Sequence, residues 1–179
     1  MNVHIAKAIE FKQRFEKLLT GKWAYRLQEI RGFSQENISA IELKYKISLP
    51  QGYRVFLSEF GNTYKSFLLD LDMGDEHPLE MTEFFYAAIN TPEQNYVPPI
   101  NVPSNIFVFA SYLYEHFYFF FINNPFDNPD DPSVYLANVD QDGGQPFQFE
   151  KVGESVWEFL EESISKYENG KKEGKYFVE

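Results

Sequence analysis

Residues 38–62 read ISAIELKYKISLPQGYRVFLSEFGN and contain two patterns of helical spacing, one on each side of a Leu-Pro step. The first pattern has three apolar residues at helical intervals: Ile38, Ile41 and Tyr45. Ser34 precedes them, and serine is a preferred N-cap residue. Leu49-Pro50 ends the pattern, because proline disfavours helical backbone in the residue before it. We therefore predict a helix between Ser34 and the Leu-Pro step.

The second pattern follows the proline directly. Its apolar residues recur at i, i+3, i+4 and i+7: Tyr53, Phe56, Leu57 and Phe60. This spacing predicts an amphipathic helix. Gly61 and Asn62 follow it, and both residue types tolerate the left-handed backbone that often ends a helix. The sequence thus predicts two short helices joined through Leu-Pro.

The flanking sequence predicts further helices and a group of strands. Helices are expected over about 3–19, 78–90 and 155–167, the last with a capping box at Ser155 and Glu158. Residues 23–30 form either a strand or a turn, and the prolines of 91–103 predict a surface loop. Strands are expected over about 66–71, 106–110, 117–122, 133–138 and 147–152.

Helices, then mainly strands, then one helix predict an α+β fold. We expect a single domain over residues 1–179, in which N-terminal helices and a C-terminal helix pack on a mainly antiparallel or mixed sheet. Its core should span about residues 30–168, and residues 169–179 should form a polar tail. The chain of 179 residues is 18% aromatic, which is enough apolar bulk for a folded core.

Charge is distributed unevenly along the chain, whose formal net charge is −11. Residues 1–65 hold 11 basic and 6 acidic side chains, whereas residues 66–150 hold 14 acidic side chains and no Lys or Arg. Such a segment cannot neutralise its carboxylates internally, so its potential reaches solvent, ions or a cationic partner. Direct nucleic-acid binding through this segment is disfavoured, because phosphate contacts need Lys or Arg.

Several classes of site are absent or disfavoured. The chain has no cysteine, which excludes disulfides, thiolate metal sites and a cysteine nucleophile. Charged residues interrupt the first 19 positions, so we expect no signal peptide. Residues 106–122 are long and apolar, but Glu115 and His116 within them favour two buried strands over a membrane span. We expect a cytoplasmic protein that does not bind membranes.

Several of these features together resemble the signature of the SUKH superfamily, which includes fungal cell-wall-assembly regulators and many bacterial immunity proteins. The matching pieces are Ile38-x-x-x-Glu42, Leu49-Pro50, Tyr53, Phe56-Leu57 and Phe60-Gly61. The strand order after Ile106 and the ending Val156-x-x-Phe159-Leu160 are also similar, so the resemblance covers about residues 30–168. One departure is Gly61-Asn62, where the family often has Asn-Gly.

The resemblance implies a non-enzymatic α+β binding scaffold without a cofactor. In bacteria, the common role of such proteins is to bind and neutralise a cognate toxin, often a nuclease, inside the producing cell. The fungal relatives imply an alternative role as a scaffold or regulator. Neither the partner nor the oligomeric state follows from the sequence.

Three acidic groups are candidate partner-binding residues: Asp70, Asp72, Asp75 and Glu76; Asp127, Asp130 and Asp131; and Asp140 and Asp142. Each group alone is interpreted equally well as solvated loop carboxylates. Taken together, they favour an electronegative face that docks on a basic protein, such as a nuclease toxin with a cationic groove. Tyr112 and Tyr114 are candidate interface anchors, because tyrosine is enriched at protein interfaces.

Chemical alternatives are weaker. Asn138-x-Asp140-x-Asp142 resembles the first half of a calcium loop, but position 12 of that loop falls on Phe149 instead of a carboxylate. A glycine hairpin turn explains the same residues more simply. A carboxylate-based hydrolase lacks a carboxylate pair with contrasting environments, and no His-Glu-x-x-His or Gly-x-Ser-x-Gly motif occurs. We therefore predict no catalytic residue, no metal and no cofactor.

Overall fold

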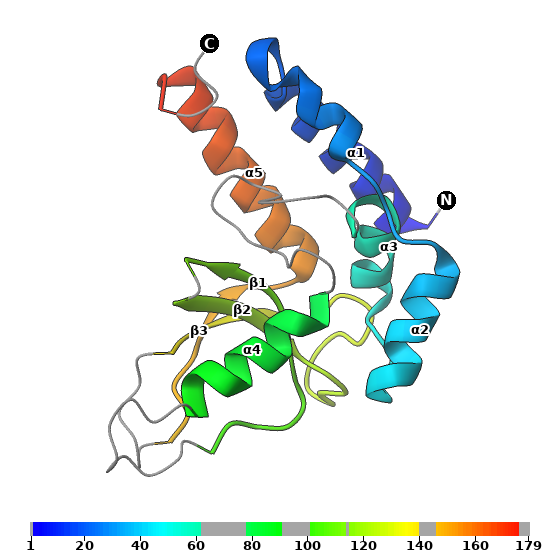
Figure 1. Cartoon of the computed structure of the whole chain (residues 1–179), viewed down its shortest axis with the longest axis vertical. Coiled ribbons are helices and arrows are strands. Elements are labelled where there is room, and N and C mark those ends of the chain that lie inside the picture. Colours follow the sequence, from blue (N-terminus) through cyan, green and yellow to red (C-terminus); the bar gives the residue numbers. More distant parts are fainter. Residues whose placement is uncertain (1, 62–77, 91–100, 114, 140–145, 176–179) are drawn as a thin grey trace.

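The computed structural model describes residues 2–61, 78–90, 101–113, 115–139 and 146–175. These residues form an α+β fold with helices at both ends of the chain and a four-stranded antiparallel sheet, which confirms the predicted fold class. Figure 1 shows the helices α1, α3 and α5 on one side of the sheet and α4 on the other. The predicted strand over 66–71 lies outside the described residues.

The element bounds follow the chain order. The helices are α1 Val3–Leu18, η1 Gly21–Glu29 (a 3₁₀ helix), α2 Gln35–Tyr45, α3 Gln51–Phe60, α4 Pro78–Asn90 and α5 Val156–Lys172. The strands are β1 Ile106–Tyr112, β2 His116–Phe121, β3 Val134–Asn138 and β4 Glu150–Gly153.

The sheet is a simple meander in the order β1-β2-β3-β4. Ile106 lies opposite Phe121 and Tyr112 opposite His116, with a shift of register between Val108 and Ala110. This irregularity is a β-bulge at Phe109, and it places Phe109 and Ala110 in the same core although they are consecutive. Six of the seven residues of β1 are buried, because the strand contributes side chains to a core on each face of the sheet.

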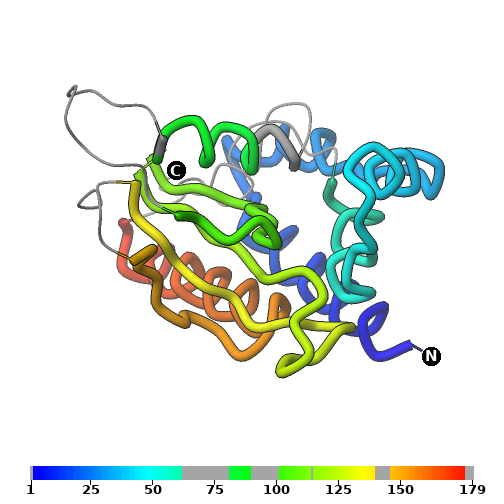
Figure 2. The backbone as a smooth tube through the Cα atoms, turned by 90° about the horizontal axis from the view of Figure 1, so that it is seen from below, coloured from blue at the N-terminus to red at the C-terminus, as the bar shows by residue number. Residues whose placement is uncertain are grey.

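The sheet is covered on both faces, as Figure 2 shows with α4 above the strands and α5 below them. The larger core joins the inner faces of α1, α3 and α5 to one face of the sheet. Tyr53 of α3 is fully buried at its centre, with its ring 5.4 Å from Phe120 and 5.5 Å from Phe107. The smaller core packs Met81, Phe85 and other residues of α4 on the opposite face. Two aromatic layers therefore account for the high aromatic content.

The Leu-Pro step between α2 and α3 is held by Glu42. Its carboxylate accepts a hydrogen bond of 2.8 Å from the amide of Leu49 and pairs with Arg54. Lys46 ends α2 in the left-handed conformation, with φ of 55°. The spacing between Glu42 and Leu49-Pro50 in the sequence thus has a structural reason, because the carboxylate holds the turn between the helices.

Some boundaries differ from the predictions. Residues 23–30, which the sequence left open between strand and turn, belong largely to the 3₁₀ helix η1. Strand β4 begins at Glu150. The Phe147 ring before it packs against Phe85 of α4, and the Phe149 ring packs against Phe119 of β2. Gly61 itself has a right-handed φ of −60°, and Asn62, the other residue of the expected pair, lies outside the described residues. A Cβ at position 61 would lie 2.5 Å from the Phe33 ring, so glycine fits this close approach.

Helix α5 extends further than expected. It continues to Lys172, and Lys171 donates hydrogen bonds to the Leu18 carbonyl at 2.9 Å and to Thr20 Oγ1 at 2.7 Å. The ammonium group thereby satisfies carbonyl oxygens near the end of α1. Part of the region expected to be a polar tail is thus helical, and hydrogen bonds connect it to the end of the N-terminal helix.

Gly32 provides a test of this packing. A Cβ at position 32 would lie 1.6 Å from the Ser58 carbonyl oxygen of α3, a contact that only backbone movement can relieve. We expect Gly32→Ala to lower the free energy of unfolding by about 2 kcal/mol or more, measured by urea denaturation. Ser39→Ala, at an exposed position of α2, is the control. An unchanged midpoint for Gly32→Ala would show that the segment does not approach α3 this closely.

Candidate partner-binding surface

Part of the predicted binding set can be placed. Asp127, Asp130 and Asp131 lie in the connection between β2 and β3, which we call the β2–β3 loop (residues 122–133), and Tyr112 ends β1. The remaining candidates lie outside the described residues: Asp70, Asp72, Asp75, Glu76, Tyr114, Asp140 and Asp142. The described candidates therefore lie on two surfaces, the loop and the region around Tyr112.

The β2–β3 loop caps helix α3 through its backbone. Pro50 occupies the N-cap position of α3 and supplies no side-chain cap. The buried amide of Gly52 instead donates a hydrogen bond of 2.6 Å to the Asp130 carbonyl. A Cβ on residue 52 would lie 3.0 Å from that oxygen, so glycine permits the close approach. The loop thus satisfies one of the amides that every helix N-terminus leaves open.

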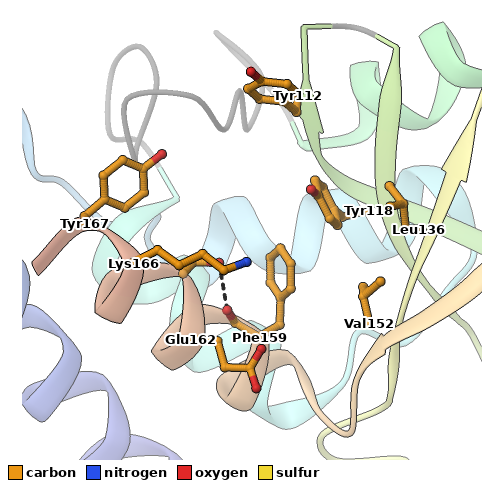
Figure 3. Close-up of a pocket in the computed structure, with 9 residues that line it drawn as sticks. Tyr112, Tyr118, Leu136, Val152, Phe159, Glu162, Lys166 and Tyr167 are labelled. Atoms are coloured by element: carbon orange, nitrogen blue, oxygen red, sulfur yellow. Dashed lines mark hydrogen bonds between the residues drawn. The ribbon is translucent and has the colours of Figure 1, made fainter. Parts of the chain in front are cut away.

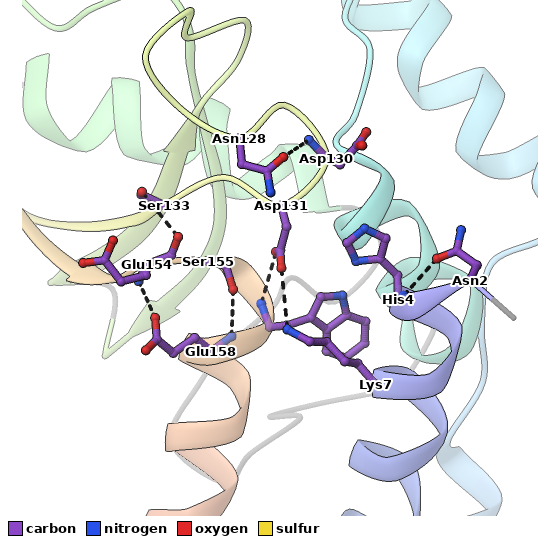
Figure 4. Close-up of polar contacts among 11 residues, drawn as sticks. Asn2, His4, Lys7, Asn128, Asp130, Asp131, Ser133, Glu154, Ser155 and Glu158 are labelled. Atoms are coloured by element: carbon purple, nitrogen blue, oxygen red, sulfur yellow. Dashed lines mark hydrogen bonds and ion pairs between the residues drawn. The ribbon is translucent and has the colours of Figure 1, made fainter.

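The carboxylate of Asp131 caps helix α5. Asp131 is 6% exposed, and its Oδ1 accepts a hydrogen bond of 3.4 Å from the Trp157 amide. Its Oδ2 lies 3.9 Å from Lys7 Nζ of α1, as Figure 4 shows. Burial raises the pKa of Asp131, and the opposing effects of Ser155, Trp157, Lys7 and His4 do not cancel this. So little of the carboxylate is exposed that a partner could touch it only slightly.

Asp127 folds the loop on itself. Its carboxylate accepts hydrogen bonds from the Asn128 amide at 2.8 Å, the Ser133 amide at 3.0 Å and Ser133 Oγ at 3.1 Å. Asn124 Oδ1 accepts from the Phe126 amide at 3.1 Å, and Asn128 Oδ1 accepts from the Asp130 amide at 3.0 Å. The Asn and Asp side chains of this loop therefore build turns, as short polar side chains do.

Among the exposed side chains of the loop, one is charged and one is aromatic. Asp130 is exposed, and its hydrogen bonds are made by its backbone amide and carbonyl. Phe126 is 95% exposed. Phe126 is absent from the residues predicted to bind a partner, because a phenylalanine in an aromatic-rich sequence is expected in the core. The sequence signal for its exposure is its place between Asn124-Pro125 and Asn128-Pro129, because both Asn-Pro pairs indicate turns and exclude a buried strand.

The second surface is a cavity of about 410 Å³ between the sheet and α5, here called the sheet–α5 cavity. Figure 3 shows Lys166 and Tyr167 on α5 on one side of it and Tyr118 on β2 on the other. The Phe159 ring of α5 lies 4.8 Å from the Tyr118 ring. Burial, reinforced by neighbouring Tyr112, raises the pKa of Tyr118, so its hydroxyl stays protonated at neutral pH. The cavity combines tyrosine hydroxyls with Glu162 and Lys166, a lining suited to a polar or aromatic side chain of a partner.

The described part of residues 78–150 carries exposed carboxylates and no basic side chain. Those carboxylates belong to Glu83, Glu115, Asp130 and Glu150. Within the described ranges, no three acidic or histidine side chains are grouped as metal ligands would be. None of the described helices is long and apolar enough to cross a membrane.

Comparison with known proteins identifies one family. The model of the SMI1 / KNR4 family (SUKH-1) matches residues 32–162, well over half of the chain. The match begins just before α2 and ends within α5, and it includes the Leu-Pro step, the whole sheet and the β2–β3 loop. No curated protein matches the chain.

The buried carboxylate of Asp131 predicts a pH dependence of stability. Because its pKa is raised on folding, the folded state holds this proton at a higher pH than the unfolded state does. Stability from this group is therefore present below the unfolded pKa of about 4 and is lost as pH rises through the folded pKa. Asp131→Asn removes the titration but keeps an oxygen for the Trp157 amide.

We expect Asp131→Asn to become more stable relative to wild type as pH rises from about 4 towards neutrality. The measurement is urea denaturation at a series of pH values, with Asp130→Asn as the exposed control one residue away. If the difference grew as pH fell, the carboxyl group would be stabilised as the anion and the described environment would be wrong.

Proposed function

The chain belongs to the SMI1 / KNR4 family (SUKH-1), and from this membership we propose that it is an immunity protein that neutralises a cognate bacterial toxin. Membership of the family supports a non-catalytic binding domain. The proposal adds that the partner is a toxin with a basic surface, that neutralisation is by occlusion, and that it takes place in the cytoplasm of the producing cell.

The observation that carries the proposal is the absence of any Lys or Arg from residues 66–150. This segment includes the sheet strands β1 to β3 and the β2–β3 loop. A toxin that cleaves nucleic acid needs a cationic groove to hold phosphate, and an acidic protein surface complements such a groove. The resulting field increases the rate of encounter and disfavours partners of like charge.

Occlusion requires surface complementarity and no chemical step by this chain. Among the described candidates, Asp130 supplies an exposed carboxylate and Tyr112, 36% exposed, lies at the sheet–α5 cavity. Asp127 and Asp131 contribute negative charge to the loop while their oxygens hold its conformation. The other acidic candidates and Tyr114 remain part of the proposal on sequence grounds alone.

Co-expression tests the role directly. On this proposal, a toxin encoded beside this gene should arrest growth when expressed alone, and the wild-type chain should restore growth. If it forms no complex with that toxin and gives no rescue, the immunity role is wrong. A regulatory scaffold of the fungal type would then be the remaining interpretation.

Asp130 gives a sharper prediction for the complex. Asp130→Lys changes the local charge by two while leaving the backbone contacts of the loop in place. We expect association with the toxin to slow by roughly 3- to 10-fold at low salt, and the difference to disappear at about 0.5 M salt, where screening is strong. The measurement is stopped-flow or surface-plasmon kinetics.

Glu16→Lys is the matched control, because Glu16 is an exposed residue of α1, outside the cation-free segment. The same charge change there should alter association much less. Equal slowing by both variants would mean that only the net charge of the whole chain matters, and the loop would then have no special part in steering.

A further inference from the structure

We propose that Phe126, at the tip of the β2–β3 loop, is an apolar anchor that inserts into a pocket of the partner protein, and that Lys or Arg side chains surround this pocket. The inference rests on the proposed function, and it adds the contact residue on this chain and the chemistry of the complementary site.

The exposure of Phe126 is the first observation. Its side chain is 95% exposed, compared with 45% for Phe149 and 44% for Phe84. Most phenylalanines of this chain are buried in the two cores. A single exposed apolar residue is common on protein surfaces, so exposure alone does not mark a site. The loop around Phe126 supplies the rest of the argument.

The loop holds Phe126 away from the body of the protein. Before the ring, Asn124 accepts from the Phe126 amide at 3.1 Å; after it, Asp127 accepts from the amide and hydroxyl of Ser133. The far end of the loop is fixed to α3 through the Asp130 carbonyl and to α5 through Asp131. These hydrogen bonds fix the backbone on both sides of Phe126, and with the backbone in this position the ring is exposed.

Such preorganisation favours binding. Because the backbone that carries Phe126 is already fixed, binding restricts only the rotamers of the ring, so more of the burial energy appears as affinity. Aromatic residues are enriched in the buried centres of interfaces, where few contacts carry most of the binding energy. The geometry of the loop therefore matches an interface anchor.

The charge around Phe126 selects the kind of partner. Asp127 follows it directly, Asp130 is exposed four residues later, and the sequence from 66 to 150 has no cation. A pocket that receives the ring thus meets carboxylates at its rim, and basic side chains there complement them. The same carboxylates oppose insertion into an anionic membrane and contact with the acidic loop of a second copy.

The first experiment uses the toxin encoded beside this gene as the probe. Phe126→Ala should keep the thermal midpoint of wild type and accelerate dissociation from the toxin at least roughly 30-fold, with little change in association rate. Leu43→Ala is the control, because Leu43 is also a large apolar residue and is 80% exposed on α2. If wild type binds the toxin and Phe126→Ala dissociates at the same rate, the anchor is wrong although the proposed function stands.

A second experiment does not depend on that toxin. The photoreactive residue p-benzoylphenylalanine is placed at position 126, or at position 43 as the control, and the full chain is irradiated in its source cells. We expect a single protein adduct at position 126 only, whose crosslinked peptide, identified by mass spectrometry, joins apolar residues to flanking Lys or Arg. An absent adduct, an equal adduct at position 43, a lipid adduct or a crosslink to a second copy would each overturn the proposal.

Discussion

The β2–β3 loop closes the N-termini of two helices, and the arrangement of the whole domain depends on this junction. Helix α3 begins after a proline that offers no side-chain cap, so its buried Gly52 amide needs a partner from elsewhere. The Asp130 carbonyl provides it, and the neighbouring Asp131 carboxylate reaches the Trp157 amide of α5 and the ammonium group of Lys7 on α1. Two consecutive residues thus connect three helices to the sheet.

The packing of the sheet explains why two loop residues are enough for this junction. Strand β1 is buried on both faces, and the bulge at Phe109 brings an extra side chain into the larger core. Aromatic rings around Tyr53 fill the space between α3 and the strands at centroid distances of 5.4–5.9 Å. Close packing of this kind fixes the orientation of the helices, and the hydrogen bonds of the loop then fix where each helix begins.

Local sequence signals predicted the fold well. The features that they missed depend on contacts between residues far apart in the sequence. Ser34 and Ser155 cap their helices as the sequence predicts, accepting from the amides of Asn37 and Glu158. Glu158, however, accepts from the Glu154 amide and so completes the capping box one residue early. The bulge depends on contacts between distant segments, as does the partnership of Asp131 with Trp157, 26 residues away. No local pattern contains that information.

The three aspartates of the loop show why composition alone could not define the candidate site. They look equivalent in the sequence, yet Asp131 is buried against α5 and Asp127 closes a turn with Ser133. Only Asp130 has an exposed side chain, and its hydrogen bonds are made by backbone atoms. Replacing all three at once would disturb both the conformation and the charge of the loop. Because backbone atoms and buried carboxylates carry the structural role, the exposed side chains of Asp130 and Phe126 are left available for a partner, and this division makes a rigid loop compatible with an interface.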